Sequence, residues 1–181
     1  MEHVSTGTIL EFIRSIQKAV ANAPDIRTLL PVISDRLVTL LGYSSSWIVR
    51  IDESGCPAQF ASAGSGGTHQ SRTVDTPAYF LSWVEKACMH PGVLVLEDDP
   101  FIETCLQVKD STDTAVLLRS LMHDGTVYGV LAVAVQSRET ATGEDITLFD
   151  SVADDISRFL SIVEAEERNR LHLMILNEIQ D

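Results

Sequence analysis

DTAVLLRSLMHDGTVYGVLAVAVQ, residues 113–136, contains two apolar runs on either side of Asp124-Gly125. An Asp-Gly pair between such runs is the strongest short-range indication of a β-hairpin. The sequence therefore predicts an antiparallel pair of strands here, and the flanking segments are expected to pack against it.

The length of the hairpin loop determines which residues stand opposite each other. A loop of Asp124 and Gly125 alone places Leu118 opposite Leu131. A three-residue loop that also includes His123, with the glycine in a left-handed bulged turn, places Leu118 opposite Val130. We favour the three-residue loop, because it sorts the side chains better by size.

In the three-residue register the two faces of the hairpin differ in bulk. One face carries large aliphatic residues around Arg119: Leu117, Leu121, Val127, Leu131, Val133 and Val135. The other face, with Tyr128 near the turn, carries Val116, Leu118, Ser120, Val130, Ala132 and Ala134. The bulky face suits helix packing, whereas serine and alanine leave room for a ligand. Arg119 lies on the helix side, where we expect it to pair with Asp150 or Asp154, because a buried arginine is normally paired.

Composition limits the class of protein. A chain of 181 residues is expected to form one domain, and its net charge of −13 argues against nucleic-acid binding and against anionic membrane surfaces. No apolar run approaches the roughly 18 residues of a membrane helix, and the N-terminus does not resemble a signal peptide. Three cysteines without CxxC spacing indicate free thiols. We therefore expect a cytoplasmic protein.

Apolar residues at helical spacing predict two helices before the first strand. The first begins near Ser5 or Thr6, and the second is capped by Asp25 and terminated by Gly42. Pro31 predicts that the second helix either kinks or begins near Thr28. A strand pair is expected next, at Ser46–Asp52 and Pro57–Ala63, followed by a loop at Gly64–Arg72. A short helix at Pro77–Met89, a short strand at Val93–Glu97 and a partly helical crossover at Asp98–Ser111 then lead to the hairpin.

A long helix is expected after Gly143, and its character changes along its length. Its first part carries an apolar stripe, followed by the polar segment Glu164–Arg170. That segment contains two pairs spaced for i,i+4 contacts, Glu164–Arg168 and Glu166–Arg170. A second stripe, out of phase with the first, then follows at Leu171, Met174, Ile175 and Ile179.

The order of these elements predicts an α+β fold, with an antiparallel sheet covered on one face by long terminal helices. Three patterns then identify a resemblance: DIRTLLPVISDRLVTLLG at Asp25–Gly42, VLVLEDDP at Val93–Pro100, and DGTVYGVLAV within Val116–Val135 followed by EDITLFDSVADDISRFL. Together they resemble a GAF domain. The resemblance implies a GAF domain at residues 25–163, after an N-terminal dimer or linker helix at 1–24 and before a C-terminal signalling-helix linker at 164–181. It also implies short connecting helices and loops on the second face of the sheet.

The resemblance implies a ligand pocket on the sheet face opposite the terminal helices. Bilin-binding relatives line it from alternating positions of the first and last strands, which here are Trp47, Val49, Val116, Leu118, Ser120, Ala132 and Ala134. We add Tyr79, Trp83, Phe101 and Leu106 from the crossovers. For the aromatic residues among them, ordinary core packing is the competing interpretation.

No pattern in the sequence supports catalysis or a metal. Cys88-Met89-His90 offers too few ligands for a closed metal site. Cys105 lies where bilin-binding relatives carry their attachment cysteine, but Leu106 follows it in place of histidine, so we expect no covalent bilin. The cysteines also lack the context of the free methionine sulfoxide reductases of this family. We therefore expect a protein that is not an enzyme, with an unknown ligand and no metal.

The leading interpretation is a sensory GAF module of a larger bacterial-type signalling protein. Its output would be a histidine kinase, a cyclic-di-GMP enzyme or a transcription regulator, reached through a parallel helical homodimer. One alternative is a ligand-free dimerisation and coupling module whose cavity is filled by Trp47, Trp83 and Phe101. A weaker alternative is a redox or haem sensor that uses Cys105 or His90.

Overall fold

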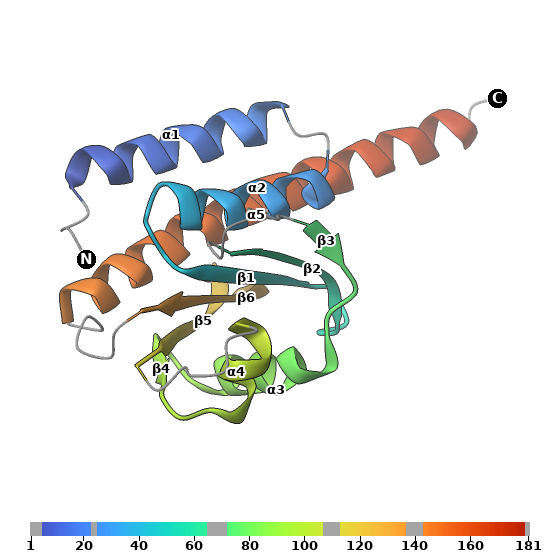
Figure 1. Cartoon of the computed structure of the whole chain (residues 1–181). Helices are drawn as coiled ribbons and strands as arrows, with labels where there is room; N and C mark the ends of the chain where they lie inside the picture. Colours follow the sequence, from blue (N-terminus) through green and yellow to red (C-terminus); the bar gives the residue numbers. More distant parts are fainter. Residues whose placement is uncertain (1–4, 23–24, 65–71, 107–112, 137–142, 180–181) are drawn as a thin grey trace.

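An antiparallel sheet of six strands forms the middle layer of the molecule (Figure 1). The computed structural model describes residues 5–22, 25–64, 72–106, 113–136 and 143–179. The strands are β1 (Ser45–Ile51), β2 (Pro57–Gly64), β3 (Arg72–Val74), β4 (Leu94–Leu96), β5 (Ala115–His123) and β6 (Thr126–Val135). Their order across the sheet is β3-β2-β1-β6-β5-β4, so β1 and β6 occupy its centre. The predicted loop Gly64–Arg72 lies mostly outside the described residues.

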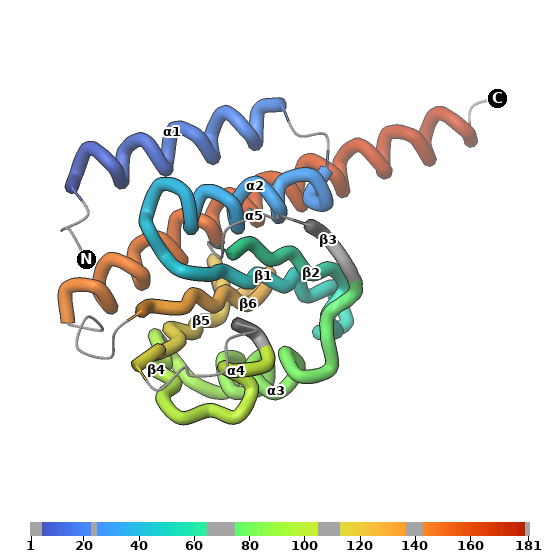
Figure 2. The backbone as a smooth tube through the Cα atoms, in the orientation of Figure 1, coloured from blue at the N-terminus to red at the C-terminus, as the bar shows by residue number. Residues whose placement is uncertain are grey.

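Helices cover both faces of this sheet (Figures 1 and 2). On one face lie α1 (Thr6–Asn22), α2 (Ile26–Thr39) and the long α5 (Gly143–Ile179). On the other face lie the shorter α3 (Ala78–Met89) and α4 (Pro100–Leu106). This arrangement confirms the predicted α+β architecture, with long terminal helices on one side and connecting helices on the other.

The ends of α2 follow the local signals in the sequence. Asp25 accepts a hydrogen bond from the Thr28 backbone N–H at 3.1 Å, as a capping residue does. The helix begins at Ile26 and runs through Pro31, so the predicted start near Thr28 is wrong. Gly42 adopts φ +76°, and its N–H donates to the carbonyl of Val38, which closes the helix as predicted.

Both predicted registers of the β5–β6 hairpin are wrong, because the structure pairs Leu118 with Ala132. The loop contains only Asp124 and Gly125, with φ values of +48° and +78°, as a primed two-residue turn requires. A bulge next to Leu121 then leaves Tyr128 as an extra residue on β6. The favoured register counts His123 in the loop, where the structure pairs it with Thr126, and neither predicted register allows for this bulge.

The predicted division of side chains between the two faces still holds for most of the hairpin. The observed register differs from the three-residue prediction by two positions, and a shift of two leaves every side chain on its own face. Val127, between the turn and the bulge, and the bulged Tyr128 are exceptions. Val127 packs with the residues under α3, and Tyr128 packs with those under α5, opposite to the prediction.

The helix-covered face carries the larger core. Phe12 and Ile16 of α1 are fully buried there, together with Leu117, Leu131 and Val133 of the hairpin. Phe149, Val152, Ile156, Leu160 and Val163 hold the first part of α5 against the sheet. None of the described helices is long and apolar enough to cross a membrane.

Candidate functional site

The sheet face under α3 and α4 carries a second core, which we call the aromatic cluster. Strands β1, β2, β5 and β6 supply one side of it, and α3 and α4 supply the other. Its buried members are Trp47, Val49, Ile51, Phe60, Phe80, Trp83, Val84, Ala87, Ile102, Val116, Leu118, Val130, Ala132 and Ala134.

Most of the predicted pocket residues meet in this cluster. Those that are buried in it are Trp47, Val49, Trp83, Val116, Leu118, Ala132 and Ala134. Tyr79 and Phe101 are partly buried and pack against it. Ser120 is half-buried on β5, and the side chain of Leu106 lies outside the described residues.

The aromatic rings of the cluster pack edge to face. Trp47 and Trp83 have their ring centroids 5.8 Å apart at 78°. Phe80 lies 5.4 Å from Trp83 and 5.2 Å from Phe60. Such pairs attract each other beyond the burial of their area. Trp47 also stands opposite Ala132 in the sheet, so its indole lies beside a position where the sequence predicts room.

A polar group borders the cluster between α3 and α4. Lys86 Nζ donates to Asp99 Oδ2 at 2.7 Å, and the Phe101 backbone N–H donates to Asp99 Oδ1 at 3.0 Å. Burial alone would raise the pKa of Asp99, but these hydrogen bonds outweigh it and hold the pKa below its usual value. The Trp83 indole N–H contributes to this effect although it makes no hydrogen bond of standard geometry. The site therefore presents an ionised carboxylate and an indole N–H beside an apolar interior.

Sequence reasoning missed the Lys86–Asp99 pair. The two residues lie 13 positions apart on different elements, so no helical or strand periodicity relates them. One local signal was present: Asp99 immediately precedes Pro100, and an Asp-Pro step is typical of a helix start.

The cysteine and histidine residues do not gather into a site within the described part of the chain. Cys88 is exposed, and desolvation raises the pKa of its thiol, which disfavours the reactive thiolate. The neighbouring Met89 points largely into solvent. No three His, Cys, Asp or Glu side chains among the described residues are placed to hold a metal ion. The side chain of Cys105 lies outside the described residues.

Arg119 is paired on the helix side, which confirms the prediction. Its guanidinium contacts the Asp154 carboxylate at 2.7 Å and the Asp150 carboxylate at 3.0 Å, and it also donates to the Asp150 carbonyl. These contacts attach the first half of α5 to β5, so Arg119 is not available as a ligand anchor.

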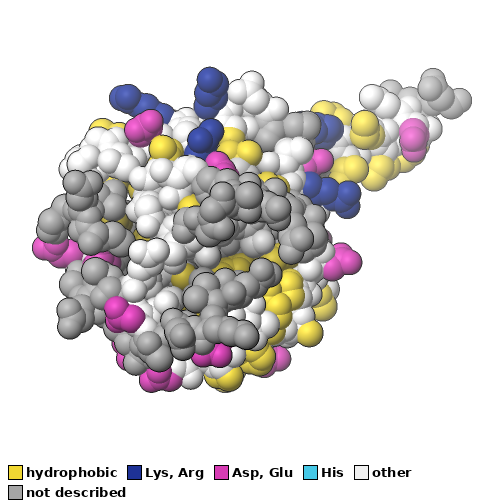
Figure 3. Space-filling view, viewed as in Figure 1, with side chains coloured by type: hydrophobic (Ala, Val, Ile, Leu, Met, Phe, Trp, Pro, Cys, Tyr) yellow, Lys and Arg dark blue, Asp and Glu magenta, His cyan; other side chains and the backbone are white. Residues whose placement is uncertain are grey.

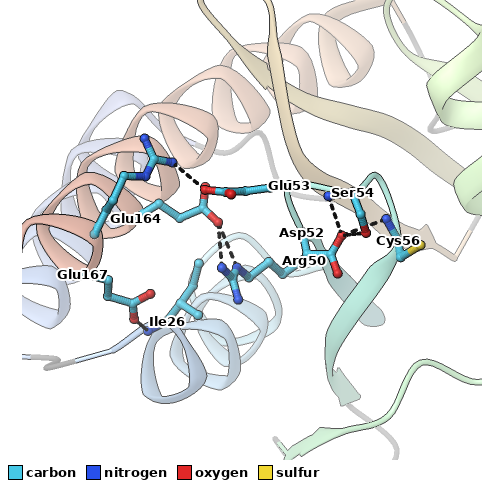
Figure 4. A network of polar contacts seen from close by, with 9 residues as sticks. Ile26, Arg50, Asp52, Glu53, Ser54, Cys56, Glu164 and Glu167 are labelled. Carbon is cyan, nitrogen blue, oxygen red and sulfur yellow. Dashed lines mark hydrogen bonds and ion pairs between the residues drawn. The ribbon is translucent and has the colours of Figure 1, made fainter. Parts of the chain in front are cut away.

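A second group of polar contacts lies where α5 leaves the sheet (Figure 4). We call it the exit junction and define it by Arg50, Glu53, Glu164, Glu167 and Arg168. Its members border a hollow of about 130 Å³ together with Leu171.

Three contacts hold this junction together. Arg50 Nε and Nη2 both contact Glu164 Oε1, at 2.9 and 2.8 Å. Arg168 Nη2 lies 3.2 Å from Glu53 Oε1 in the β1–β2 turn. Glu167 accepts a hydrogen bond from the Ile26 backbone N–H, at the start of α2, at 2.8 Å. Glu164 and Arg168, which the sequence predicts to pair with each other, are thus bound to residues more than a hundred positions away.

Comparisons with known proteins agree with this architecture. The sequence profile described as the GAF domain matches residues 25–160. No curated protein shows a significant match to the chain. Similar solved structures include the nlh2 GAF domain of A. aeolicus in an inactive state, with 13% identity and a TM-score of 0.58, covering 86% of this chain and 96% of that one.

Two further structures show the same fold in larger proteins. Residues 122 to 287 of a methyl-accepting chemotaxis protein are 15% identical, with a TM-score of 0.58, over 83% of this chain and 97% of that one. The bacteriophytochrome RpBphP3 of R. palustris is 12% identical, with a TM-score of 0.58, over 99% of this chain and 42% of that one. Identities this low indicate a shared fold only. With the profile match over most of its length and the sheet and helices arranged as described, the chain belongs to the GAF domain family.

Proposed function

We propose that this GAF domain is a regulatory, non-catalytic module that couples a small-molecule site in the aromatic cluster to a downstream output through α5. The course of α5 carries this proposal. The helix packs on the sheet as far as Val163, is bound to the domain by Glu164 and Glu167, and continues from Arg168 to Ile179 as an exposed extension (Figures 1 and 3). A helix that is both anchored in a domain and free beyond it can transmit a displacement outward.

The similar structures support a signalling role. One comes from a chemotaxis protein and another from a bacteriophytochrome. In this chain the output would be a histidine kinase, a cyclic-di-GMP enzyme or a transcription regulator, with residues 164–181 as the linker to it. A cytoplasmic location is consistent with the exposed free thiols of Cys56 and Cys88.

The proposed ligand is small and mostly apolar. The strand positions of the cluster offer aliphatic and aromatic surface, and the polar groups beside it include the Trp83 indole, the Lys86–Asp99 pair and Ser120 on β5. Pockets with an apolar lining and a few polar groups at fixed positions are typical of small-molecule sites. Because Trp47 and Trp83 are in contact, a ligand would enter by displacing one of the two rings.

Tryptophan fluorescence provides the test, because Trp47 and Trp83 are the only tryptophans in the chain. We expect a ligand from a panel of small metabolites to change the emission of both residues and to raise the melting temperature in proportion to its occupancy. Native mass spectrometry of protein purified from its own host would identify the bound mass. A panel that changes neither fluorescence nor melting temperature would contradict ligand binding.

A ligand-free coupling module is the second candidate, and the ring packing favours it. Trp83 is fully buried and Trp47 is 3% exposed. Phe80 packs against Trp83, and Phe60 packs against Phe80. On this alternative the cluster is simply a second core, and the module only joins neighbouring parts of a signalling protein.

We also propose that the module acts as a parallel homodimer through its terminal helices. The apolar stripe of α5 up to Val163 is used within the domain, so the surface for a second copy must come from elsewhere. Exposed apolar side chains remain on α1 and α5, at Leu10, Ile162, Leu171, Leu173, Met174, Ile175, Leu176 and Ile179. Those beyond Arg168 belong to neither core of the described residues and lie on the part of α5 that projects from the domain (Figure 3).

Light scattering after size exclusion checks the dimer. We expect the wild-type chain to be dimeric at high micromolar concentration and the Leu173→Glu, Leu176→Glu double variant to be monomeric with an unchanged melting temperature of the domain. The physical reason is that each buried leucine contributes about 2 kcal/mol, which a solvated glutamate cannot replace. Leu81→Glu, at a similarly exposed position on α3, serves as the control and should remain dimeric. A monomeric wild-type chain would contradict the proposal.

A further inference from the structure

We propose that the Arg50–Glu164 contact of the exit junction is the point at which strand β1 controls the free end of α5. This proposal rests on the proposed function, because it names the contact through which the aromatic cluster would act on α5. It would make the junction a positioning device between the aromatic cluster and residues 164–179.

Strand β1 connects the two faces of the sheet by the alternation of its side chains. Trp47 and Val49 point into the aromatic cluster, and Ile48 lies in the core under the helices. Arg50, the next residue after Val49, reaches Glu164 on the helix side. A movement of β1 caused on the cluster side therefore moves the guanidinium that holds α5.

The strand pairing around Arg50 is irregular on both sides, so the direction of its side chain depends on the spacing between β1 and its neighbouring strands. The pairing of β1 with β2 shifts between Arg50 and Ile51. On its other edge, Arg50 pairs with Gly129, directly beside the bulge in β6. Bulges redirect side chains and increase local twist, so a small change in strand spacing here is expressed as a change in where Arg50 points.

On the helix side, Glu164 lies at the boundary between the packed and the free part of α5. Val163 is buried in the helix-side core, whereas every residue from Arg168 to Ile179 is exposed. The side chains of Arg50 and Glu164 are 22% and 11% exposed, so this pair is shielded from solvent. The Arg168–Glu53 pair is largely exposed and therefore adds little. Of the two charge pairs of the exit junction, Arg50–Glu164 is thus the one expected to contribute more to holding this turn of α5 against the sheet.

A double-mutant cycle read by amide hydrogen exchange tests this inference without any ligand. The four proteins are wild type, Val49→Ala, Glu164→Gln and the double variant, and the readout is exchange in residues 164–170. We expect Glu164→Gln to accelerate exchange there about tenfold, because a shielded, charge-assisted hydrogen bond is lost. We expect Val49→Ala to accelerate it about threefold in the wild-type background and to have no further effect once Glu164 is replaced.

Val116→Ala is the matched control. Val116 is as buried as Val49 and belongs to the same aromatic cluster, but it lies on β5, outside the junction. It should leave exchange at 164–170 within twofold of wild type. Equal effects of Val49→Ala and Val116→Ala would overturn the inference, as would a Val49→Ala effect that persists in the Glu164→Gln background. The proposed ligand site is tested separately by tryptophan fluorescence, so each idea can fail without the other.

Discussion

Trp83→Ala is expected to lower the free energy of unfolding by about 4 kcal/mol, because replacing a fully buried aromatic side chain with alanine removes its contacts and leaves a cavity. The indole contacts two other rings, Trp47 and Phe80, so its loss also removes two edge-to-face pairs. For a domain of this size the loss corresponds to a fall of about 10 °C in melting temperature. Urea unfolding followed by far-UV circular dichroism measures the effect independently of tryptophan emission.

Two companion variants separate the causes of this loss. Leu81→Ala, at a 41% exposed position on the same helix, should cost less than about 1 kcal/mol. Trp83→Phe keeps an aromatic ring but removes the indole N–H beside Asp99, and we expect a cost of about 2 kcal/mol. If Trp83→Ala cost no more than Leu81→Ala, the cluster would be loosely packed. That result would favour an open ligand pocket over the ligand-free coupling module.

The sequence predicts part of the aromatic cluster. Strand alternation groups Ala132 with its neighbours on the hairpin, and the resemblance to the GAF family adds Trp47 and Val49, which the structure buries in the same cluster. What the alternation cannot supply is the distance between that face and α3. This distance depends on the connections on either side of the helix, so whether Trp47 and Trp83 line a space or fill it is a property of the tertiary structure.

The polar contacts show the same division between local and long-range information. Arg119 could be assigned to Asp150 or Asp154, because its face on β5 is fixed by period-two alternation and α5 covers that face. The partner of Glu164 could not be assigned in this way. Its helical neighbour Arg168 is available by spacing, but Arg50, 114 positions away, is the residue that binds it. A shielded position beside the sheet is more favourable for this pair than the solvent-exposed side of a helix.

The hairpin register failed for a local reason that the sequence does contain. Gly129 is an isolated glycine inside a strand, which is a known sign of a bulge or of a close backbone approach. The structure shows both features at this position: Tyr128 is the bulged residue, and Gly129 lies against β1. Treating β6 as regular misplaces the partner of Leu118 by one position, and counting His123 in the loop misplaces it by one more.

Gly129→Ala is the second substitution with a large expected effect, a loss of about 3 kcal/mol in the free energy of unfolding. A Cβ atom at this position would lie 2.2 Å from the carbonyl oxygen of Val49 and 3.5 Å from Cα of Arg50. Because the first of these neighbours is backbone, no side-chain rotation can relieve the clash. The central strands β1 and β6 would have to separate, which strains their hydrogen-bonded pairing.

Gly143→Ala is the matched control for this prediction, since a Cβ atom at Gly143 meets nothing within 4 Å. Alanine is also the better helix former at the start of α5, so the change should be within about 1 kcal/mol of neutral. Both variants can be compared by urea unfolding under identical conditions. If Gly129→Ala proved as stable as Gly143→Ala, β6 could move away from β1 without cost. The pairing of Gly129 with Arg50 could then not hold the guanidinium beside Glu164, and the exit junction would lose its fixed support in the sheet.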